Sequence, residues 1–202
     1  MTPLLLLALA YLLGAIPTSL MAGKLARGID LRQHGSGNLG ATNTYRVLGW
    51  RAAVPVFIVD VGKGWLPTHF FPRWDNAAAG EWALAYGAAA IVGHVFSVYV
   101  RFKGGKGVAT SSGVLLALAP LAVGAATLVW TIIVFTTGYV SLGSIVAAVL
   151  VPVIVFLAQG PGPVLWLALA LAAFVIFAHR ANIRRLLRGQ EHSFKKKAKP
   201  AA

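Results

Sequence analysis

Long runs of apolar residues follow one another along the chain, separated by short polar and basic segments. They have the length of membrane-spanning helices and lack the strict alternation of membrane strands. We therefore predict an all-α integral membrane protein, with one membrane domain over residues 1–190 and a basic, disordered tail over residues 191–202. The apolar runs cover residues 3–22, 52–72, 77–96, 107–137, 141–157 and 162–179.

The composition excludes a soluble globular domain. Of the 202 residues, 58% are hydrophobic and only 11% are charged, with a mean hydropathy of +0.75. A soluble fold of this length has too little interior to bury so much apolar surface. The net charge is +13, but the basic residues cluster between the apolar runs. They therefore indicate membrane topology and anionic partners, and no nucleic acid partner is expected. The chain has no cysteine, which excludes thiol chemistry.

Three segments carry most of the basic residues: residues 23–51, residues 97–106 and residues 180–199. The positive-inside rule places all three in the cytoplasm. The first apolar run has no basic residue before it, whereas Lys24 and Arg27 follow it. This order is the reverse of a secretory signal and predicts an uncleaved first span whose N-terminus lies outside.

Residues 97–106 and the C-terminal basic residues are both expected in the cytoplasm, so the chain between them must cross the membrane an even number of times. This requirement decides how residues 107–137 are arranged. As one helix this run would be about 46 Å long, against a hydrocarbon core of about 30 Å. It would also put the basic tail outside. Pro120 is the natural break. Splitting the run there predicts seven transmembrane helices, with the N-terminus outside and the C-terminus in the cytoplasm.

The run from Gly35 to Asn43 is polar and rich in glycine. Glycine tolerates positive φ, so such a loop can turn its N–H groups inward around an anion. The alternative is a solvent loop that joins two helices. The candidate ligands of this first motif are Ser36, Gly37, Asn38, Gly40, Thr42, Asn43 and Arg46.

A second motif opens the span that follows residue 106. Its lysines could be topology signals alone, but the glycines beside them remove side-chain bulk for no topological reason. Helix N-termini and lysines at one depth are typical of an anion site for more than one phosphate group. The candidates are Lys103, Gly104, Gly105, Lys106, Gly107 and Thr110.

A third set lies in the C-terminal part of the chain. Ser141 and Ser144 begin a span and could cap the helix or contact substrate, with Ser141 the favoured contact. His179 could be an interfacial histidine, but Asn182, one turn along the same face, favours a polar site. We expect Arg184, Arg185 and Arg188 to contact headgroups.

Two charged residues lie well inside the second expected span. Asp60 and Lys63 are three residues apart and share one helix face, so we predict an ion pair, because an unpaired charge is costly there. The pair is either structural or positions the site. His94, near the cytoplasmic end of the third span, is either interfacial or functional.

Several chemistries are excluded. The acidic residues Asp30, Asp60, Asp75, Glu81 and Glu191 are scattered, and no histidine pair has zinc-ligand spacing. Lys106 is followed by glycine and not by Ser or Thr, so the second motif is not a P-loop. No His-x4-Asp motif, aspartate cluster or Ser–His–acid set is present. We expect neither a metal nor another cofactor.

The three motifs together resemble the bacterial acyl-phosphate:glycerol-3-phosphate acyltransferase family. They are Ser36-Gly-Asn-Leu-Gly-Ala-Thr-Asn43, Lys103-Gly-Gly-Lys-Gly-Val-Ala-Thr110 and His179-Arg-Ala-Asn-Ile-Arg-Arg-Leu, followed by Gly189 and Glu191. The resemblance implies an inner-membrane enzyme of seven spans with a cytoplasm-facing site. It also implies acyl transfer from acyl phosphate to the 1-hydroxyl of glycerol 3-phosphate, giving lysophosphatidic acid and inorganic phosphate.

For that reaction, His179, Lys106 and Asn38 are the expected catalytic residues, and the other residues of the motifs, with Ser141, are expected to bind substrate. The base is either His179 or a substrate phosphate oxygen. The expected partners are the two substrates, membrane lipids and the soluble enzyme that supplies acyl phosphate. The rival interpretation is an anion or phosphate-ester transporter, but the outer loops are short and carry only Arg73 as a basic residue. A scaffold protein would leave the polar motifs unexplained.

Overall fold

Every regular element is a helix in the part of the chain that the computed structural model describes, residues 1–77 and 82–195. The chain divides into two compact units, Met1–Pro120 and Leu121–Ala202. The first unit contains, in order, α1 (Pro3–Ala15), α2 (Thr18–Arg27), η1 (Leu31–Gln33), α3 (Ala41–Leu48), α4 (Trp50–Phe70), η2 (Phe71–Arg73), α5 (Ala83–Val95), η3 (Val98–Val100) and α6 (Val108–Leu118). The second contains α7 (Pro120–Thr137) apart from its first residue, followed by α8 (Val140–Gln159), α9 (Pro163–Ala178) and α10 (Arg180–Leu187).

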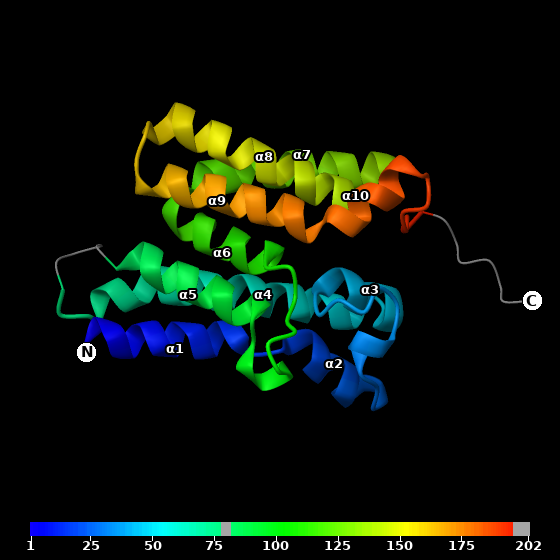
Figure 1. Ribbon diagram of the computed structural model, residues 1–202, viewed down its shortest axis with the longest axis horizontal. Helices are drawn as coiled ribbons and strands as arrows, with labels where there is room; N and C mark the ends of the chain where they lie inside the picture. The colour runs from blue at the N-terminus through cyan, green and yellow to red at the C-terminus, as the bar shows by residue number, and fades with distance from the viewer. Residues whose placement is uncertain (78–81, 196–202) are drawn as a thin grey trace, which may run out of the picture. The chain divides into compact units, whose positions relative to one another are not determined.

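Glycines set the helix packing of the first unit, in which α1, α4 and α5 run side by side (Figure 1). Gly14 of α1 lies against the backbone of Ala90 in α5, and Gly93 of α5 lies against the backbone of Tyr11. A Cβ atom at either glycine would overlap the facing main chain. Glycine thus lets two apolar helices approach closely, as is usual inside membranes.

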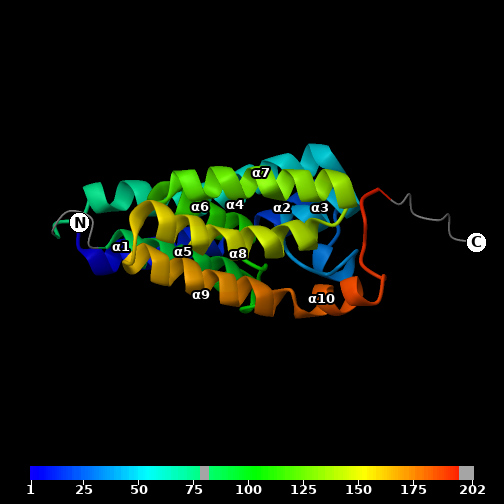
Figure 2. The same cartoon turned by 90° about the horizontal axis from the view of Figure 1, so that it is seen from above.

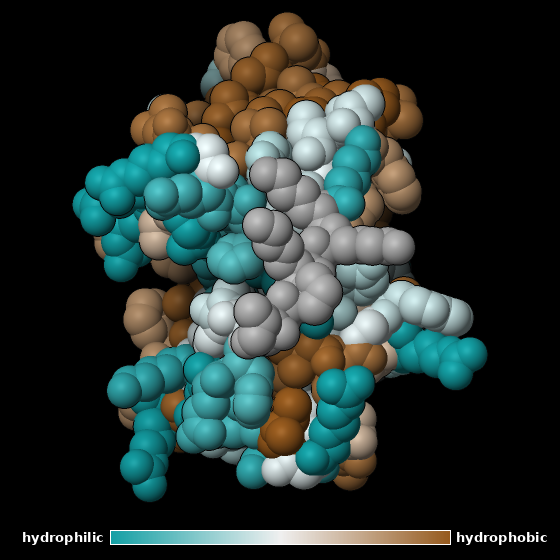
Figure 3. Space-filling view, turned by 90° about the vertical axis from the view of Figure 1, so that its right-hand side faces the viewer, coloured by the Kyte–Doolittle hydropathy of each residue, from teal (hydrophilic) through white to brown (hydrophobic). Residues whose placement is uncertain are grey.

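The outer surface of the first unit is apolar. On α4, Val54, Phe57 and Ile58 are each about half exposed or more, at 48%, 51% and 61%. Large apolar side chains on this scale belong against lipid and not against water. Hydrophilic side chains instead gather at the end of the unit where α2 and α3 lie (Figure 3).

In the second unit, α7, α8 and α9 lie alongside one another (Figure 2). Gly143 of α8 faces Trp130 and Val134 of α7, and the Trp130 indole donates a hydrogen bond to the Ser144 hydroxyl at 3.3 Å. Helix α10 follows α9 directly but is bent from it by 57° at His179.

The predicted break at Pro120 is confirmed, since α6 ends at Leu118 and α7 begins at Pro120. The first expected span, residues 3–22, lies within one candidate membrane span, Pro3–Arg27, in which Pro17 interrupts the helix between α1 and α2 because proline supplies no N–H to a helix interior. The described segments 1–77 and 82–195 contain four helices or joined helices that are long and apolar enough to cross a membrane, or five if α9 and α10 form one span. Helix α4 and the shorter α6 are not among them.

The beginning of the expected tail packs on the second unit. Glu191 is only 6% exposed, and the ring of Phe194 contacts that of Phe135 in α7. The Lys195 ammonium donates a hydrogen bond to the carbonyl of Thr136 at 2.7 Å. Residues 196–202, the rest of the expected disordered tail, lie outside the described residues.

Candidate active site

Asn43 closes the glycine-rich loop of the first motif. Its side-chain oxygen accepts a hydrogen bond from the Ser36 N–H at 2.8 Å, and its amide nitrogen donates to the carbonyls of Leu31 and His34 at 3.1 and 3.0 Å. The residue is 1% exposed. Asn43 therefore shapes the loop from inside, a role that the sequence motif did not indicate.

The conformation of this loop depends on two glycines with positive φ, Gly35 at 63° and Gly37 at 71°. The Gly37 N–H turns back to the carbonyl of His34 at 3.1 Å. Beyond it, the N–H groups of residues 38–42 have no hydrogen-bond acceptor within the described chain. These five consecutive donors lead into the N-terminus of α3, where the helix dipole favours an anion.

At the base of this loop, Asp30 and Arg32 form an ion pair with a shortest distance of 2.6 Å. The hydrogen bonds and charge of the Arg32 guanidinium lower the pKa of the Asp30 carboxyl to about 2, against a smaller opposing effect of burial. The carboxylate also accepts the Arg32 N–H at 2.9 Å. The pair therefore stays ionised and holds the turn that precedes the motif.

The glycine–lysine loop of the second motif, residues 103–107, is anchored to the end of α5. The Gly104 N–H donates to the carbonyl of Val95 at 3.0 Å, and the Gly105 N–H donates to that of His94 at 3.1 Å. Gly107, with a φ of 75°, then turns the chain into α6. Lys103 is exposed and Lys106 is half-buried, so both lie at or near the surface of the unit.

These two loops meet in the first unit. A Cβ atom at Gly105 would overlap both the carbonyl oxygen of Leu39 and the Nε2 atom of His94. Leu39 also packs with Leu31 and Val100 in one buried apolar cluster. Two motifs more than sixty residues apart thus contact each other at Leu39 and Gly105.

The remaining candidates of the first unit differ in accessibility. Ser36 is exposed, and Gly37, Gly40, Thr42, Arg46 and Gly104 are partly exposed. Thr110 is fully buried against Gly64 of α4, and its hydroxyl has no hydrogen-bond partner among the described residues. Thr110 therefore belongs to the α4–α6 contact.

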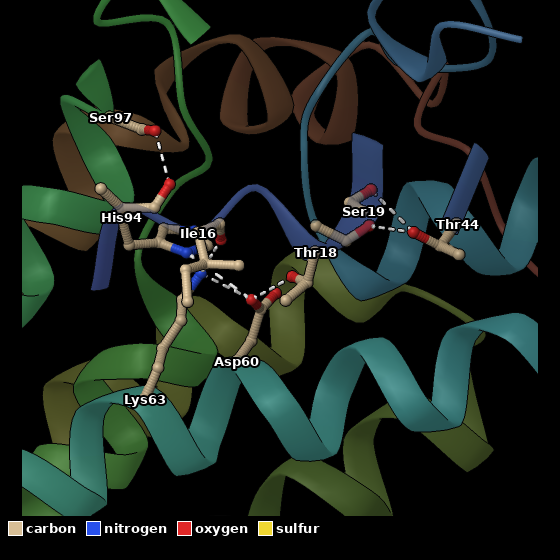
Figure 4. Close-up of polar contacts among 10 residues, drawn as sticks. Ile16, Thr18, Ser19, Thr44, Asp60, Lys63, His94 and Ser97 are labelled. Atoms are coloured by element: carbon tan, nitrogen blue, oxygen red, sulfur yellow. Dashed lines mark hydrogen bonds and ion pairs between the residues drawn. The ribbon is translucent and has the colours of Figure 1, made fainter. Parts of the chain in front are cut away.

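A buried ionic cluster lies among α1, α2, α4 and α5 (Figure 4). The predicted Asp60–Lys63 pair is confirmed at 2.8 Å, with the two side chains 1% and 3% exposed. The Thr18 hydroxyl donates to Asp60 at 2.5 Å, and the Lys63 ammonium donates to the carbonyl of Ile16 at 2.9 Å. His94 Nδ1 lies 3.8 Å from the same carboxylate.

In the second unit, Glu191 is the centre of the polar contacts. One carboxylate oxygen accepts the Ser141 hydroxyl at 2.9 Å and the Asn182 amide at 2.7 Å, and the other accepts Arg185 Nε at 2.6 Å. Burial alone would raise the pKa of Glu191, but these three hydrogen bonds and the Arg185 charge together lower it below its ordinary value. Arg185, which we expect to contact headgroups, thus also binds Glu191 through its Nε atom.

His179 lies at the bend between α9 and α10 and is 5% exposed. Its Nδ1 atom is 2.8 Å from the carbonyl of Val175. A carbonyl accepts only, so Nδ1 carries the proton, and in the neutral ring Nε2 holds the lone pair. The second serine, Ser144, donates to the carbonyl of Val140 at 3.0 Å, as a hydroxyl in a helix commonly does.

The structure thus groups the candidates by unit: the first two motifs with Asp60, Lys63 and His94 in one, and Ser141, His179 and Asn182 with Glu191 in the other. Sequence spacing gave no sign that Glu191 binds Ser141, fifty residues earlier. Among residues 1–77 and 82–195, no group of three or more acidic or histidine side chains could hold a metal ion.

Comparison with known proteins agrees with these motifs. The family profile described as glycerol-3-phosphate acyltransferase matches residues 4–189. A glycerol-3-phosphate acyltransferase of Trichlorobacter lovleyi is 48% identical over 186 residues, which are 92% of this chain and 94% of the relative. Another from Bacillus cereus is 44% identical over 200 residues, 98% of this chain and 99% of the relative.

A solved structure has the same fold. It is the crystal structure of PlsY, an integral membrane glycerol 3-phosphate acyltransferase, in its glycerol 3-phosphate form. The TM-score is 0.85, with 42% identity and 95% of each chain covered. The lysophosphatidic acid form of that protein matches equally well. Profile, relatives and structure agree over nearly the whole chain, and the chain therefore belongs to the glycerol-3-phosphate acyltransferase family.

Proposed function

We propose that this protein transfers a fatty acyl group from acyl phosphate to the 1-hydroxyl of glycerol 3-phosphate. The products are lysophosphatidic acid and inorganic phosphate, which places the reaction in phospholipid biosynthesis. The observation that carries this proposal is the run of five N–H groups at residues 38–42, which lack an acceptor in the described chain and adjoin the glycine–lysine loop. Such donors suit the phosphate groups that both substrates carry.

The first unit would hold the phosphate of acyl phosphate, the leaving group of the reaction. The backbone donors of residues 38–42 and the Asn38 amide would bind its oxygens, with Arg46 and Lys106 supplying positive charge. Lys103, at the start of the same loop, adds to the positive field. The glycines of both loops keep side-chain bulk away from the ligand.

The second unit would hold glycerol 3-phosphate, with His179 and Asn182 as its ligands. Glu191 orients Asn182 and Ser141 through the hydrogen bonds described above. Ser141, whose hydroxyl proton is engaged by Glu191, can still accept a hydrogen bond from the substrate. We assign Glu191 to positioning and not to contact with the reacting atoms.

The chemistry needs one proton transfer. The primary hydroxyl of glycerol 3-phosphate attacks the acyl carbonyl, the C–O bond to phosphate breaks, and the hydroxyl proton passes to a base. With its Nδ1–H donated to Val175, the His179 ring in its neutral form has its lone pair on Nε2, which suits this role. A phosphate oxygen of the substrate is the other candidate. Backbone amides and Lys106 would stabilise the developing oxyanion.

We further propose seven spans in the inner membrane of a bacterium, with the N-terminus outside and the site facing the cytoplasm. The charge distribution and the confirmed break at Pro120 support this topology. Residues 1–190 would form the acyltransferase domain, and the acyl chain would lie in the bilayer. No cofactor, metal or nucleic acid enters the proposal, and the soluble enzyme that supplies acyl phosphate is a candidate partner.

A defined assay tests the activity. Purified protein in detergent is incubated with palmitoyl phosphate and glycerol 3-phosphate, without metal or nucleotide, and both products are measured. The proposal predicts equal amounts of lysophosphatidic acid and inorganic phosphate. Glycerol 3-phosphate uptake into proteoliposomes without any product would instead establish the transporter, and neither product nor uptake would contradict both activities.

A further inference from the structure

Asp60, Lys63 and His94 form a buried cluster that the proposed reaction does not use. We propose that this cluster is a positioning device for the glycine–lysine loop, residues 103–107, so that its integrity sets the affinity for the phosphate that this loop binds. The inference rests on the proposed function, because it assigns that loop to substrate binding. Figure 4 shows the three side chains converging from α4 and α5.

The cluster first joins α4 to the break between α1 and α2. Asp60 accepts the Thr18 hydroxyl at 2.5 Å, and Lys63 donates to the Ile16 carbonyl at 2.9 Å. That carbonyl lies beside Pro17, where the helix is interrupted. Two charges buried among helices are costly, and these two are paired with each other and hydrogen-bonded to a different segment of the chain. The pair thus fixes the end of α1.

His94 then links the Asp60–Lys63 pair to the glycine–lysine loop. Its ring is 7% exposed and lies between the Asp60 carboxylate, 3.8 Å from Nδ1, and Gly105, whose Cβ position would overlap Nε2. His94 Nδ1 has no hydrogen-bond partner among the described residues. A shift of the carboxylate or of the ring would therefore displace Gly105 through this direct contact.

The main chain completes the connection. The His94 and Val95 carbonyls accept the N–H groups of Gly105 and Gly104 at 3.1 and 3.0 Å. The Ser97 hydroxyl donates to the carbonyl of Ala15 at 2.5 Å, next to the residue that Lys63 holds. The end of α5, the end of α1 and the start of the loop are thus tied together through one set of contacts.

The size of the space around the cluster excludes direct contact with substrate there. The cavity that Ile16, Lys63, His94, Gly104 and Gly105 help to line has a volume of about 10 Å³. This is the lower limit for a single water molecule, and far too small for a glycerol phosphate. The cluster therefore lies behind the loop and offers no substrate-sized space of its own.

The test compares three changes with a matched control. Asp60→Asn and His94→Phe each alter the support of the loop, and Asp60→Asn with Lys63→Met removes both charges together. Tyr86→Phe is the control, since it deletes a partly buried hydrogen bond to Asp75, 2.7 Å long, at the opposite end of α5. Melting temperature, kcat and the KM for each substrate are measured in detergent.

We expect the KM for acyl phosphate to rise about tenfold in all three cluster variants, because small misplacements of binding groups are costly. Asp60→Asn leaves Lys63 unpaired and should lower the melting temperature most, and the double variant should recover part of that loss. Tyr86→Phe should lower the melting temperature with an unchanged KM. A purely structural cluster would behave like this control, and wild-type KM values in the double variant and His94→Phe would overturn the proposal.

Inorganic phosphate provides a readout that does not depend on turnover. Its Kd, from thermal-shift titration of each variant, should rise in parallel with the KM. A rise in the KM for glycerol 3-phosphate alone would support the positioning role but reverse the assignment of the two phosphates. Wild-type protein that binds phosphate but transfers no acyl group would contradict the proposed function, while the Kd series would still decide the positioning role.

Discussion

The Ser141 hydroxyl donates a hydrogen bond to the Glu191 carboxylate at 2.9 Å, joining the first turn of α8 to the segment after α10. The same carboxylate holds Asn182 and Arg185. Three segments of the second unit therefore depend on one negative charge that is almost fully buried.

This dependence predicts a loss of stability in acid. The folded-state pKa of Glu191 lies below its ordinary value of 4.5, so ionisation favours the folded state. The contribution is complete above pH 4.5 and is lost as the pH falls through the folded-state pKa. Asp30, whose folded-state pKa is about 2 against an ordinary value of 3.8, also loses stabilisation as the pH falls below 3.8, so the effect of Glu191 is read from the difference between wild type and a Glu191 variant.

Thermal unfolding of Glu191→Gln against wild type measures the effect. The difference in melting temperature between wild type and Glu191→Gln should be constant above about pH 5 and should shrink as the pH falls below about 4. Glu191→Gln should have a lower melting temperature than wild type at pH 7. It should also lose the part of the acid-induced decrease in melting temperature that Glu191 causes. An identical pH profile in the two proteins would show that Glu191 is not the group responsible.

Replacing Asn43 should disrupt the structure of the glycine-rich loop. Asn43→Ala removes the acceptor of the Ser36 N–H and one of the two donors to each of the carbonyls of Leu31 and His34, which should cost about 1 to 3 kcal/mol of local stability. The loop should then open, and we expect the KM for acyl phosphate to rise along with faster hydrogen exchange over residues 34–43. Unchanged exchange in this segment would contradict the role of Asn43 as the closure of the loop.

Two glycines of α4 provide a matched test of helix packing. A Cβ atom at Gly64 would overlap the carbonyl of Thr110 in α6, whereas nothing lies within 4 Å of one at Gly62. Gly64→Ala should therefore destabilise the protein by about 1 to 3 kcal/mol. Gly62→Ala should be neutral or stabilising by up to about 1 kcal/mol, because alanine favours the helix. Equal melting temperatures for the two variants would mean that α4 and α6 are not closely packed.

Cysteine labelling tests the topology, since the natural chain contains no cysteine. Thr2→Cys and Gln190→Cys introduce single exposed thiols at the two ends of the membrane domain. In intact bacterial cells, a membrane-impermeant maleimide should label Thr2→Cys and should label Gln190→Cys only after lysis. Labelling of Gln190→Cys in intact cells would place the C-terminus outside and contradict the predicted parity.

Much of the first unit follows from local rules. The break at Pro120 could be predicted because a single helix would exceed the membrane thickness, and the Asp60–Lys63 pair because residues three apart share a helix face. The interruption at Pro17 was missed, since the apolar run continues on both sides of the proline. Charge and hydropathy indicate which segments lie in the membrane, but they say less about the residue at which a helix ends.

The contacts that shape the site could not be predicted, because they join residues far apart in the chain. The overlap of Gly105 with Leu39 and the binding of Ser141 to Glu191 depend on how whole segments pack. Asn43 shows the same limit at short range: its side chain has the donors that a phosphate ligand needs, but the folded loop uses them internally. Residue type thus indicated phosphate-binding chemistry, and only the packing shows which side chains are available for it.

The central claim is that the first two motifs bind the phosphate of acyl phosphate, and acyl transfer by Asn38→Ala, Lys106→Ala and Lys196→Ala proteins tests it most directly. Lys196 lies outside the described residues, in the basic tail, and serves as the control. With palmitoyl phosphate and glycerol 3-phosphate in detergent, the first two variants should retain less than about 1% of wild-type kcat/KM, and Lys196→Ala should retain all of it. Wild-type turnover by the Lys106→Ala protein would contradict the account.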